Sequence, residues 1–178
     1  MEKNMSFNAA AFKGSGKVNG VPVFTDKLPL TVGGIVSDAS TDGLTFGRVA
    51  YRDADNLDYF VQGKGDSNTV VAGIAIADPS IMMLDPAMND YYFSGRPATV
   101  VTHGLVQLSD VLSSTDDSSL SEAAYGSKVV FNTTTGKIGF VASTGTVADG
   151  YAELDAYVYD ITGPNGVTIF LNKPAVVA

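Results

Sequence analysis

The chain has 178 residues, no cysteine, and 11 basic against 19 acidic side chains, which gives a formal net charge of −8. A chain of this length is expected to form one domain that buries about 70% of the surface of its unfolded state, without disulfide or metal support. The negative charge argues against binding to nucleic acid, and the lack of any apolar run of roughly 20 residues argues against a membrane role. The missing cysteine and the lack of a charged-then-apolar leader predict synthesis in a cytosol.

Residues 1–30 are the most basic part of the chain and show no sustained helix or strand period. They hold four lysines against one glutamate and one aspartate, a charge of +2, so the rest of the chain carries −10. Five apolar side chains are too many for a purely disordered tail: Phe7, Phe12, Val21, Val23 and Phe24. We predict an extended N-terminal arm over 1–30 that docks on its own chain or on another copy, followed by a single β domain over 31–178. An ordinary solvated tail is the alternative.

Short strands are expected to follow in close order over 31–37, 44–52 and 59–62, separated by turns rich in Gly, Asp and Asn. The stretches 70–78 and 99–108 are then expected to pair at the centre of the fold.

In the stretch 70–78, the even positions Val70, Ala72, Ile74 and Ile76 carry the bulk, and the odd positions from Val71 are small. One face is therefore predicted to fill a core, while the other lets a neighbour approach closely. The stretch 99–108 is apolar on both faces except at Thr102, His103 and Gln107, which is typical of a strand covered by layers on both sides.

Two connecting segments have unusual compositions. The loop 79–97 is rich in Met and Tyr, which suits either a surface that adapts to a partner or a plug for the open end of a barrel. The segment 110–127 is acidic and is expected to be a mobile excursion. Within it, Ser119 and Glu122 could form the capping box of a short helix over 119–124.

The C-terminal third predicts the clearest hairpins. A turn at 133–136, with Gly136 in the left-handed position, joins 129–132 to 137–142. The stretch 151–160 places small and apolar residues on one face and tyrosines and acids on the other: Tyr151, Glu153, Asp155, Tyr157 and Tyr159. A turn at 164–166 leads into 167–171. Because only closure or a second sheet covers so many one-sided strands, we predict an all-β fold, an antiparallel β-barrel or β-sandwich with an extended N-terminal arm.

Catalytic and metal-binding patterns are not found. His103 is the single histidine, and the chain has neither a Gly-x-Ser-x-Gly elbow nor a cysteine nucleophile, so we predict no enzyme and a hydrogen-bonded or subunit-contact role for His103. The acidic bend 53–58 lacks the glycine and glutamate of an EF-hand loop and is expected to be solvated, with a looser cation site as the alternative. We predict no catalytic residue, no cofactor and no metal.

Four short segments follow one another in a distinctive order: 5–8 (Met-Ser-Phe-Asn), 45–53 (TFGRVAYRD), 71–75 (VAGIA) and 92–106 (YFSGRPATVVTHGLV). This order resembles that of the structural cement (head decoration) proteins of tailed bacteriophages. The resemblance covers residues 5–108 well and extends more loosely to 171.

This resemblance implies a non-enzymatic structural protein of the virion, made in the bacterial host cytoplasm. Such a protein would bind the outer surface of the capsid and clamp adjacent major capsid protein subunits, as a homo-oligomer, either a trimer or a dimer. The predicted capsid or subunit interface comprises Phe7, Phe12, Phe24, Arg48, Met83, Tyr91 and Tyr92.

Two other functions stay open at this point. The first is a carbohydrate-binding β-sandwich on a phage surface or fibre, which would use Tyr151, Tyr157 and Tyr159 beside Glu153 and Asp155. The second is an enzyme with a carboxylate pair, because Glu153 and Asp155 lie on one strand face. A wetted strand face has the same appearance.

Overall fold

The computed structural model describes residues 19–23, 29–40, 43–64, 70–77, 91–161 and 166–173. Over these residues the chain forms twelve strands and no helix. The strands are β1 (Val21–Val23), β2 (Leu30–Val36), β3 (Leu44–Thr45), β4 (Val49–Arg52), β5 (Tyr59–Gln62), β6 (Val71–Ala75), β7 (Tyr91–Tyr92), β8 (Pro97–Leu108), β9 (Lys128–Asn132), β10 (Ile138–Val141), β11 (Tyr151–Ile161) and β12 (Val167–Lys173).

Five strands close a β-barrel in the order β8, β2, β5, β4 and β6, and β6 returns to β8 through the pairs Ile74↔Val101 and Ala75↔Val100. The predicted all-β class is confirmed, and the barrel is the alternative that forms. One pairing, β2 with β5, is parallel; the other ladders among the described residues are antiparallel.

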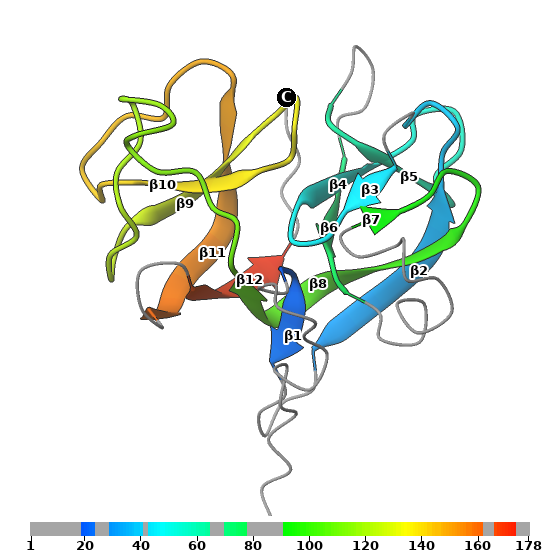
Figure 1. Cartoon of the computed structure of the whole chain (residues 1–178), viewed down its shortest axis with the longest axis horizontal. Coiled ribbons are helices and arrows are strands. Elements are labelled where there is room, and N and C mark those ends of the chain that lie inside the picture. Colours follow the sequence, from blue (N-terminus) through cyan, green and yellow to red (C-terminus); the bar gives the residue numbers. More distant parts are fainter. Residues whose placement is uncertain are drawn as a thin grey trace, which may run out of the picture.

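The long strand β8 belongs to two sheets. Its first half lies in the barrel, and its second half pairs with β12 on one side and β1 on the other. The second sheet continues from β12 through β11 and β9 to β10. Figure 1 shows the result as two lobes, with β2 to β7 in one, β9 to β11 in the other, and β8 running between them. The expectation that this stretch is covered on both sides is thus confirmed.

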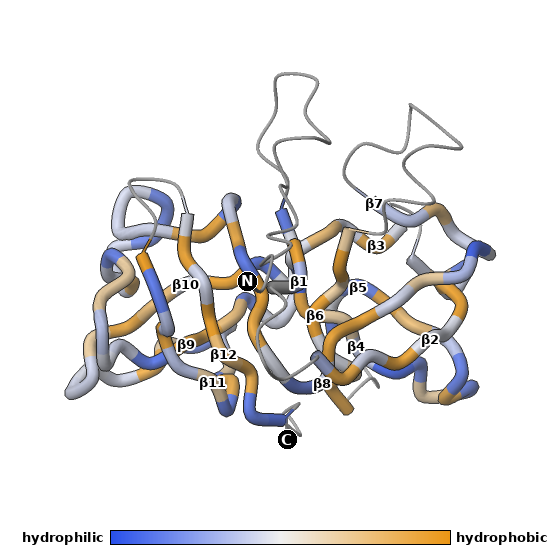
Figure 2. Tube along the Cα trace, turned by 90° about the horizontal axis from the view of Figure 1, so that it is seen from below, coloured by the Kyte–Doolittle hydropathy of each residue, from blue (hydrophilic) through white to orange (hydrophobic). Residues whose placement is uncertain are grey.

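Alternating side chains of the barrel strands supply two separate cores. In β4, Ala50 points into the barrel interior with Phe60 and Val100, while Val49 and Tyr51 point into a core shared with the second sheet. The shared core also contains side chains from the second lobe, including Phe131, Phe140 and Ile169. Hydrophobic colouring follows the strands, and the most hydrophilic stretches lie mainly in peripheral turns (Figure 2). Because both lobes contribute to one core, each depends on the other for its burial.

The alternation predicted along 70–78 holds after Gly73, but before Gly73 the two faces are exchanged, so Val71 and Ala72 lie on the opposite faces from those expected. Val71, Ile74 and Ile76 face the shared core, whereas Ala72, Ala75 and Ala77 face the barrel interior. The cause is a bulge, since the β4–β6 register shifts between Ala50 and Tyr51, and Gly73 adopts a φ of 152°. A Cβ at Gly73 would meet the carbonyl oxygen of Val101, so the close approach expected for this stretch is made by β8.

The acidic segment 110–127 covers the free edge of β10 and contains no helix, so the predicted helix over 119–124 is wrong. The amide of Leu112 donates to the carbonyl of Ile138 (2.7 Å), and that of Ser121 donates to the carbonyl of Phe140 (2.8 Å). Leu120 packs on Val130 and Val141. A covered edge cannot pair with another chain. These contacts fix the segment on the sheet edge, where a mobile excursion is expected from the sequence, and we call residues 110–127 the acidic cap.

The predicted C-terminal hairpins are confirmed in their pairing. β9 and β10 pair antiparallel, and Gly136 has a φ of 69° in the turn between them. β11 and β12 also pair antiparallel, although the turn residues 164 and 165 lie outside the described residues. Along β11 the outward face is as expected from Glu153 to Tyr159, but Tyr151 is half-buried under the acidic cap.

Candidate interaction surface

Aromatic side chains gather on the outer face of the second sheet and extend onto the barrel. Tyr157 of β11 stacks on Phe170 of β12, with ring centroids 5.3 Å apart, and His103 of β8 meets Phe170 edge-on at 5.1 Å. Leu30 of β2 lies opposite His103 in the register. We call this set, with Tyr159, the aromatic strip: Tyr157, Tyr159, Phe170, His103 and Leu30. It crosses four adjacent strands.

Polar bonds hold the strip in place. Nδ1 of His103 lies 2.7 Å from the carbonyl oxygen of Asn172, and the side-chain amide of Asn172 donates to Oδ1 of Asp155 at 2.9 Å. His103 is therefore a hydrogen-bonded residue beside an aromatic ring. These bonds join β8, β12 and β11, so the rings keep their positions without a partner.

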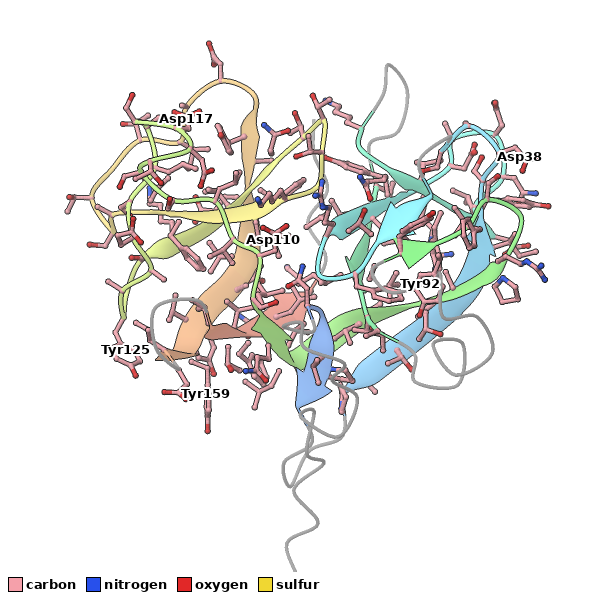
Figure 3. The ribbon with its side chains drawn as sticks, in the orientation of Figure 1. Asp38, Tyr92, Asp110, Asp117, Tyr125 and Tyr159 are labelled. Atoms are coloured by element: carbon pink, nitrogen blue, oxygen red, sulfur yellow. The ribbon has the colours of Figure 1, made fainter. Side chains whose placement is uncertain are left out.

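The strip presents large apolar surface to solvent. Leu30 is 61% exposed, Tyr159 53% and Tyr157 45%. Tyr125, also exposed, bonds through its hydroxyl to Oδ1 of Asp160 at 3.4 Å. Figure 3 shows Tyr125 and Tyr159 on the same lower edge of the second lobe. Contiguous exposed side chains of this kind mark surfaces that bind a partner.

Acidic side chains accompany the strip. Glu153 and Asp155 lie on the outward face of β11 with the tyrosines, and Asp160 follows on the same strand. Two lysines lie along the register: Lys173 of β12 is opposite Asp155, and Lys128 of β9 is opposite Tyr157. The surface therefore carries net negative charge beside its rings. Glu153 and Asp155 are both exposed, as expected of a wetted face.

The first described residue, Asn19, fastens the start of the chain to both lobes. Its side-chain amide donates to the carbonyl of Phe46 (2.6 Å) in the barrel lobe, and its Oδ1 accepts from the amide of Ser109 (2.9 Å) at the end of β8. The next residues form β1, which pairs with β8. This part of the predicted arm thus docks on its own chain.

Arg48 also lies at the junction of the two lobes, with 22% of its side chain exposed. Its guanidinium donates to the carbonyl of Thr135 (3.3 Å) and lies 3.8 Å from Asp110, which pairs with Lys137 at 2.7 Å. Figure 3 places Asp110 between the lobes. Because these groups are partly exposed, each ion pair contributes roughly 0–1 kcal/mol, and their main effect is to orient the turns they join.

The other predicted interface residues fall into three groups. Tyr91 is half-buried on β7, with its ring 4.8 Å from that of Phe93. Tyr92 is completely buried in the barrel interior, where its hydroxyl donates to the carbonyl of Ile76 (2.7 Å), so its side chain is not on the surface of the isolated chain. The remaining four lie outside the described residues: Phe7, Phe12, Phe24 and Met83.

The acidic bend 53–58 is organised by hydrogen bonds within the chain. The hydroxyl of Ser37 donates to Asp53 (2.7 Å), as does the amide of Asp55 (2.9 Å), and these bonds hold the pKa of Asp53 below its usual value. Within the described ranges, no group of three or more His, Asp or Glu side chains is placed to hold a metal ion. No helix among the residues seen here is long and apolar enough to cross a membrane.

Sequence reasoning found the tyrosines of β11 but not the other half of the strip. Leu30 falls at the end of the predicted arm, and no face is assigned from the sequence to the stretch 167–171, where alternation groups Phe170 with Thr168. Only the pairing of β11 with β12 and of β2 with β8 brings them beside Tyr157 and His103.

The fold and this surface define a class: a two-lobed all-β protein with an outward aromatic surface. Residues 5–171 match the family described as structural cement protein (E217 gp24/Pam3 gp6). The chain belongs to this family of phage structural cement proteins. The resemblance seen in the sequence is confirmed, and membership implies that the chain associates with a phage capsid as a structural component.

A solved structure has the same fold. A chain in the capsid of Myoviridae phage XM1 is 19% identical, with a TM-score of 0.58 over 88% of this chain and 93% of that chain. At this identity the likeness shows the fold alone. A search of curated proteins finds no match.

Proposed function

We propose that this protein binds the outer surface of a phage capsid and stabilises it by clamping adjacent major capsid protein subunits, without catalysing a reaction. The observation that carries the proposal is the family match, which spans residues 5–171. The two-lobed shape supports it, because a clamp needs contact surfaces that are separate in space yet rigidly joined (Figure 1).

The shared core and the junction supply that rigidity. The ring centroids of Tyr51 in the barrel lobe and Phe131 in the second lobe are 6.0 Å apart. Asn19 adds hydrogen bonds to Phe46 in the barrel lobe and to Ser109 at the end of β8. Load applied between two capsid subunits would pass through packed side chains rather than through a flexible linker. The interface that we propose keeps Phe7, Phe12, Phe24, Arg48, Met83 and Tyr91, and it leaves out Tyr92 because its side chain is buried.

Stabilisation of the shell follows from mass action. A protein that binds the assembled shell and not its free subunits shifts the equilibrium toward the shell by RT ln(1 + [L]/Kd) for each site. A modest affinity at each site, repeated over many sites, therefore gives a large total effect. This mechanism needs no catalytic group.

The test is co-sedimentation of the purified protein with capsids that lack it, alongside its mass in solution by light scattering. We expect saturable binding at a fixed ratio to the major capsid protein, and a higher temperature of capsid disruption in the bound particles. A cryo-electron map of the decorated particles then shows which side is bound and whether each copy touches two capsid subunits.

Three results would count against the proposal. Density on the inner side of the shell contradicts the exterior placement. Binding to a single subunit, with no change in the disruption temperature, contradicts the clamp. No binding, together with a monomer in solution, would favour the carbohydrate-binding alternative, for which the exposed faces of Tyr157 and Tyr159 would be the platform.

A further inference from the structure

The aromatic strip is a sheet face that no described segment of the chain covers. Its rings are held in place from within, yet Tyr157, Tyr159 and Leu30 stay about half or more exposed. Burying these side chains against a partner would remove their apolar surface from water, which favours association.

Charge disfavours a symmetric contact between two strips. Face-to-face packing would gather the exposed carboxylates of Glu153 and Asp155 from both copies in one interface. Like charges brought together at an interface cost free energy, and burial raises that cost further. The strip therefore calls for a basic partner that also carries apolar side chains.

The eighteen residues before Asn19 have that chemistry. They hold three lysines (Lys3, Lys13 and Lys17) against one glutamate, a charge of +2, and they carry Phe7 and Phe12. We propose that the aromatic strip of one copy binds residues 1–18 of a second copy. This deepens the proposed function, because arms exchanged between clamps would link neighbouring clamps into a network over the shell.

The recognition follows from ordinary side-chain chemistry. A lysine ammonium placed over the outer face of Tyr157 or Tyr159 is attracted by the ring and by the carboxylates of Glu153 and Asp155 beside it. A phenylalanine of the arm packs against the edge of the strip. Both contacts need the rings in the orientation that the Tyr157–Phe170 stack provides.

The arm is long enough to reach the strip of a second copy. From β1 to β11 the sheet crosses β8 and β12, about 14 Å at the usual strand spacing. Phe12 and Phe7 lie seven and twelve residues before Asn19, which gives upper limits of about 23 and 40 Å for their distance from it. These limits allow contact with the strip of a neighbouring copy as well as with the arm's own strip, and mixing of complementary variants separates the two.

The first experiment measures the mass of the full chain in solution over a range of concentrations, by sedimentation or light scattering. We expect self-association that weakens about tenfold in Tyr157→Ala and in the double variant Lys13→Glu/Lys17→Glu, and that also weakens with added salt. Leu57→Ala is the matched control, because Leu57 is 64% exposed on the barrel lobe, away from the strip, and should leave association unchanged. Thermal unfolding confirms that each variant folds.

A mixing experiment separates exchange from self-docking. Tyr157→Ala copies keep an intact arm, and Lys13→Glu/Lys17→Glu copies keep an intact strip, so an equal mixture should regain part of the association that each lacks alone. A mixture that behaves as the average of its components would overturn the assignment to a second copy. A wild-type chain that is monomeric at every concentration would overturn the proposal altogether.

Capsid binding is read out separately. A Tyr157→Ala variant that no longer self-associates but still saturates capsids supports both proposals. A variant that loses capsid binding while its solution mass is unchanged would overturn the arm exchange and assign the strip to the capsid protein. Failure of wild-type capsid binding, with association intact, leaves the arm exchange standing and contradicts only the proposed function.

Discussion

Two buried tyrosines show how a single hydroxyl can help or burden a core. The hydroxyl of Tyr92 donates to the carbonyl of Ile76, whereas the hydroxyl of Tyr51, equally buried, has no hydrogen-bond partner among the residues that the structure describes. Taking a hydroxyl out of water without a partner costs free energy, while a buried bond returns most of that cost. Burial also raises the pKa of Tyr51 to about 12.

We expect Tyr51→Phe to leave the free energy of unfolding unchanged or to raise it by about 1 kcal/mol, because it removes an unpaired group. Tyr92→Phe, the matched control, should lower it by about 1–2 kcal/mol, since it strands the carbonyl of Ile76. Denaturant unfolding of both variants at neutral pH measures the difference. Equal losses in the two would mean that the hydroxyl of Tyr51 is satisfied in solution, by water for example.

The pKa of Tyr51 adds an alkaline signature. Its folded-state pKa is raised above the ordinary value of 10, so the wild type is fully stabilised by this group below pH 10 and loses that stability as pH rises through about 12. Tyr51→Phe should therefore flatten the alkaline limb of unfolding.

At the scale of elements, the acidic cap depends on turns built by its own carboxylates. Asp117 accepts from the amide (2.9 Å) and hydroxyl (2.8 Å) of Ser119, and from the hydroxyl of Tyr151 (2.9 Å). These bonds, those from Ser119 first, hold the pKa of Asp117 below its usual value. Burial, and then the bond to Asp117, raises the pKa of Tyr151.

Protonation of Asp117 should loosen the cap in acid. Because its folded-state pKa is lowered, its contribution to stability is present above about pH 3.8 and is lost as pH falls below that value through the lowered pKa. Asp117→Asn should make the acid limb of unfolding shallower and increase amide exchange in 110–127. Asp149→Asn, which removes an exposed carboxylate from the same lobe, is the control and should leave the exchange of that segment unchanged.

At the scale of the whole molecule, one core and one junction make the lobes interdependent. The shared core takes side chains from β4 and β6 as well as from β9, β10 and β12. Asn19, Arg48 and Asp110 then connect turns of the two lobes around it. We therefore expect a single unfolding transition, since neither lobe can bury its apolar face alone.

Asn19→Ala tests the junction. It removes a donor to Phe46 and an acceptor for Ser109, both partly buried, so we expect the free energy of unfolding to fall by about 1–3 kcal/mol with the transition still single. Asn56→Ala is the control, because its side chain bonds only within an exposed turn and should cost less than about 1 kcal/mol. Calorimetry reports both quantities, and two separate transitions in either variant would contradict the interdependence.

The sequence by itself determined the all-β class, the positions of most strands, the C-terminal hairpin and the family. These features rest on local physics: period-two alternation, turn residues such as Gly136, and an order of segments that needs no spatial information. The outward face of β11 could be predicted for the same reason.

Tertiary structure alone decided the rest. The bulge at Gly73 exchanges the faces of Val71 and Ala72 relative to the rest of β6. The sequence could not show this one-residue slip, because it depends on the close approach of β8. Tyr92 is predicted at an interface, but its ring is packed in the barrel interior, and Phe170 comes to lie beside Tyr157 only through the pairing of β11 with β12. Burial and pairing between distant segments assign a side chain to core or surface, and no local pattern records them.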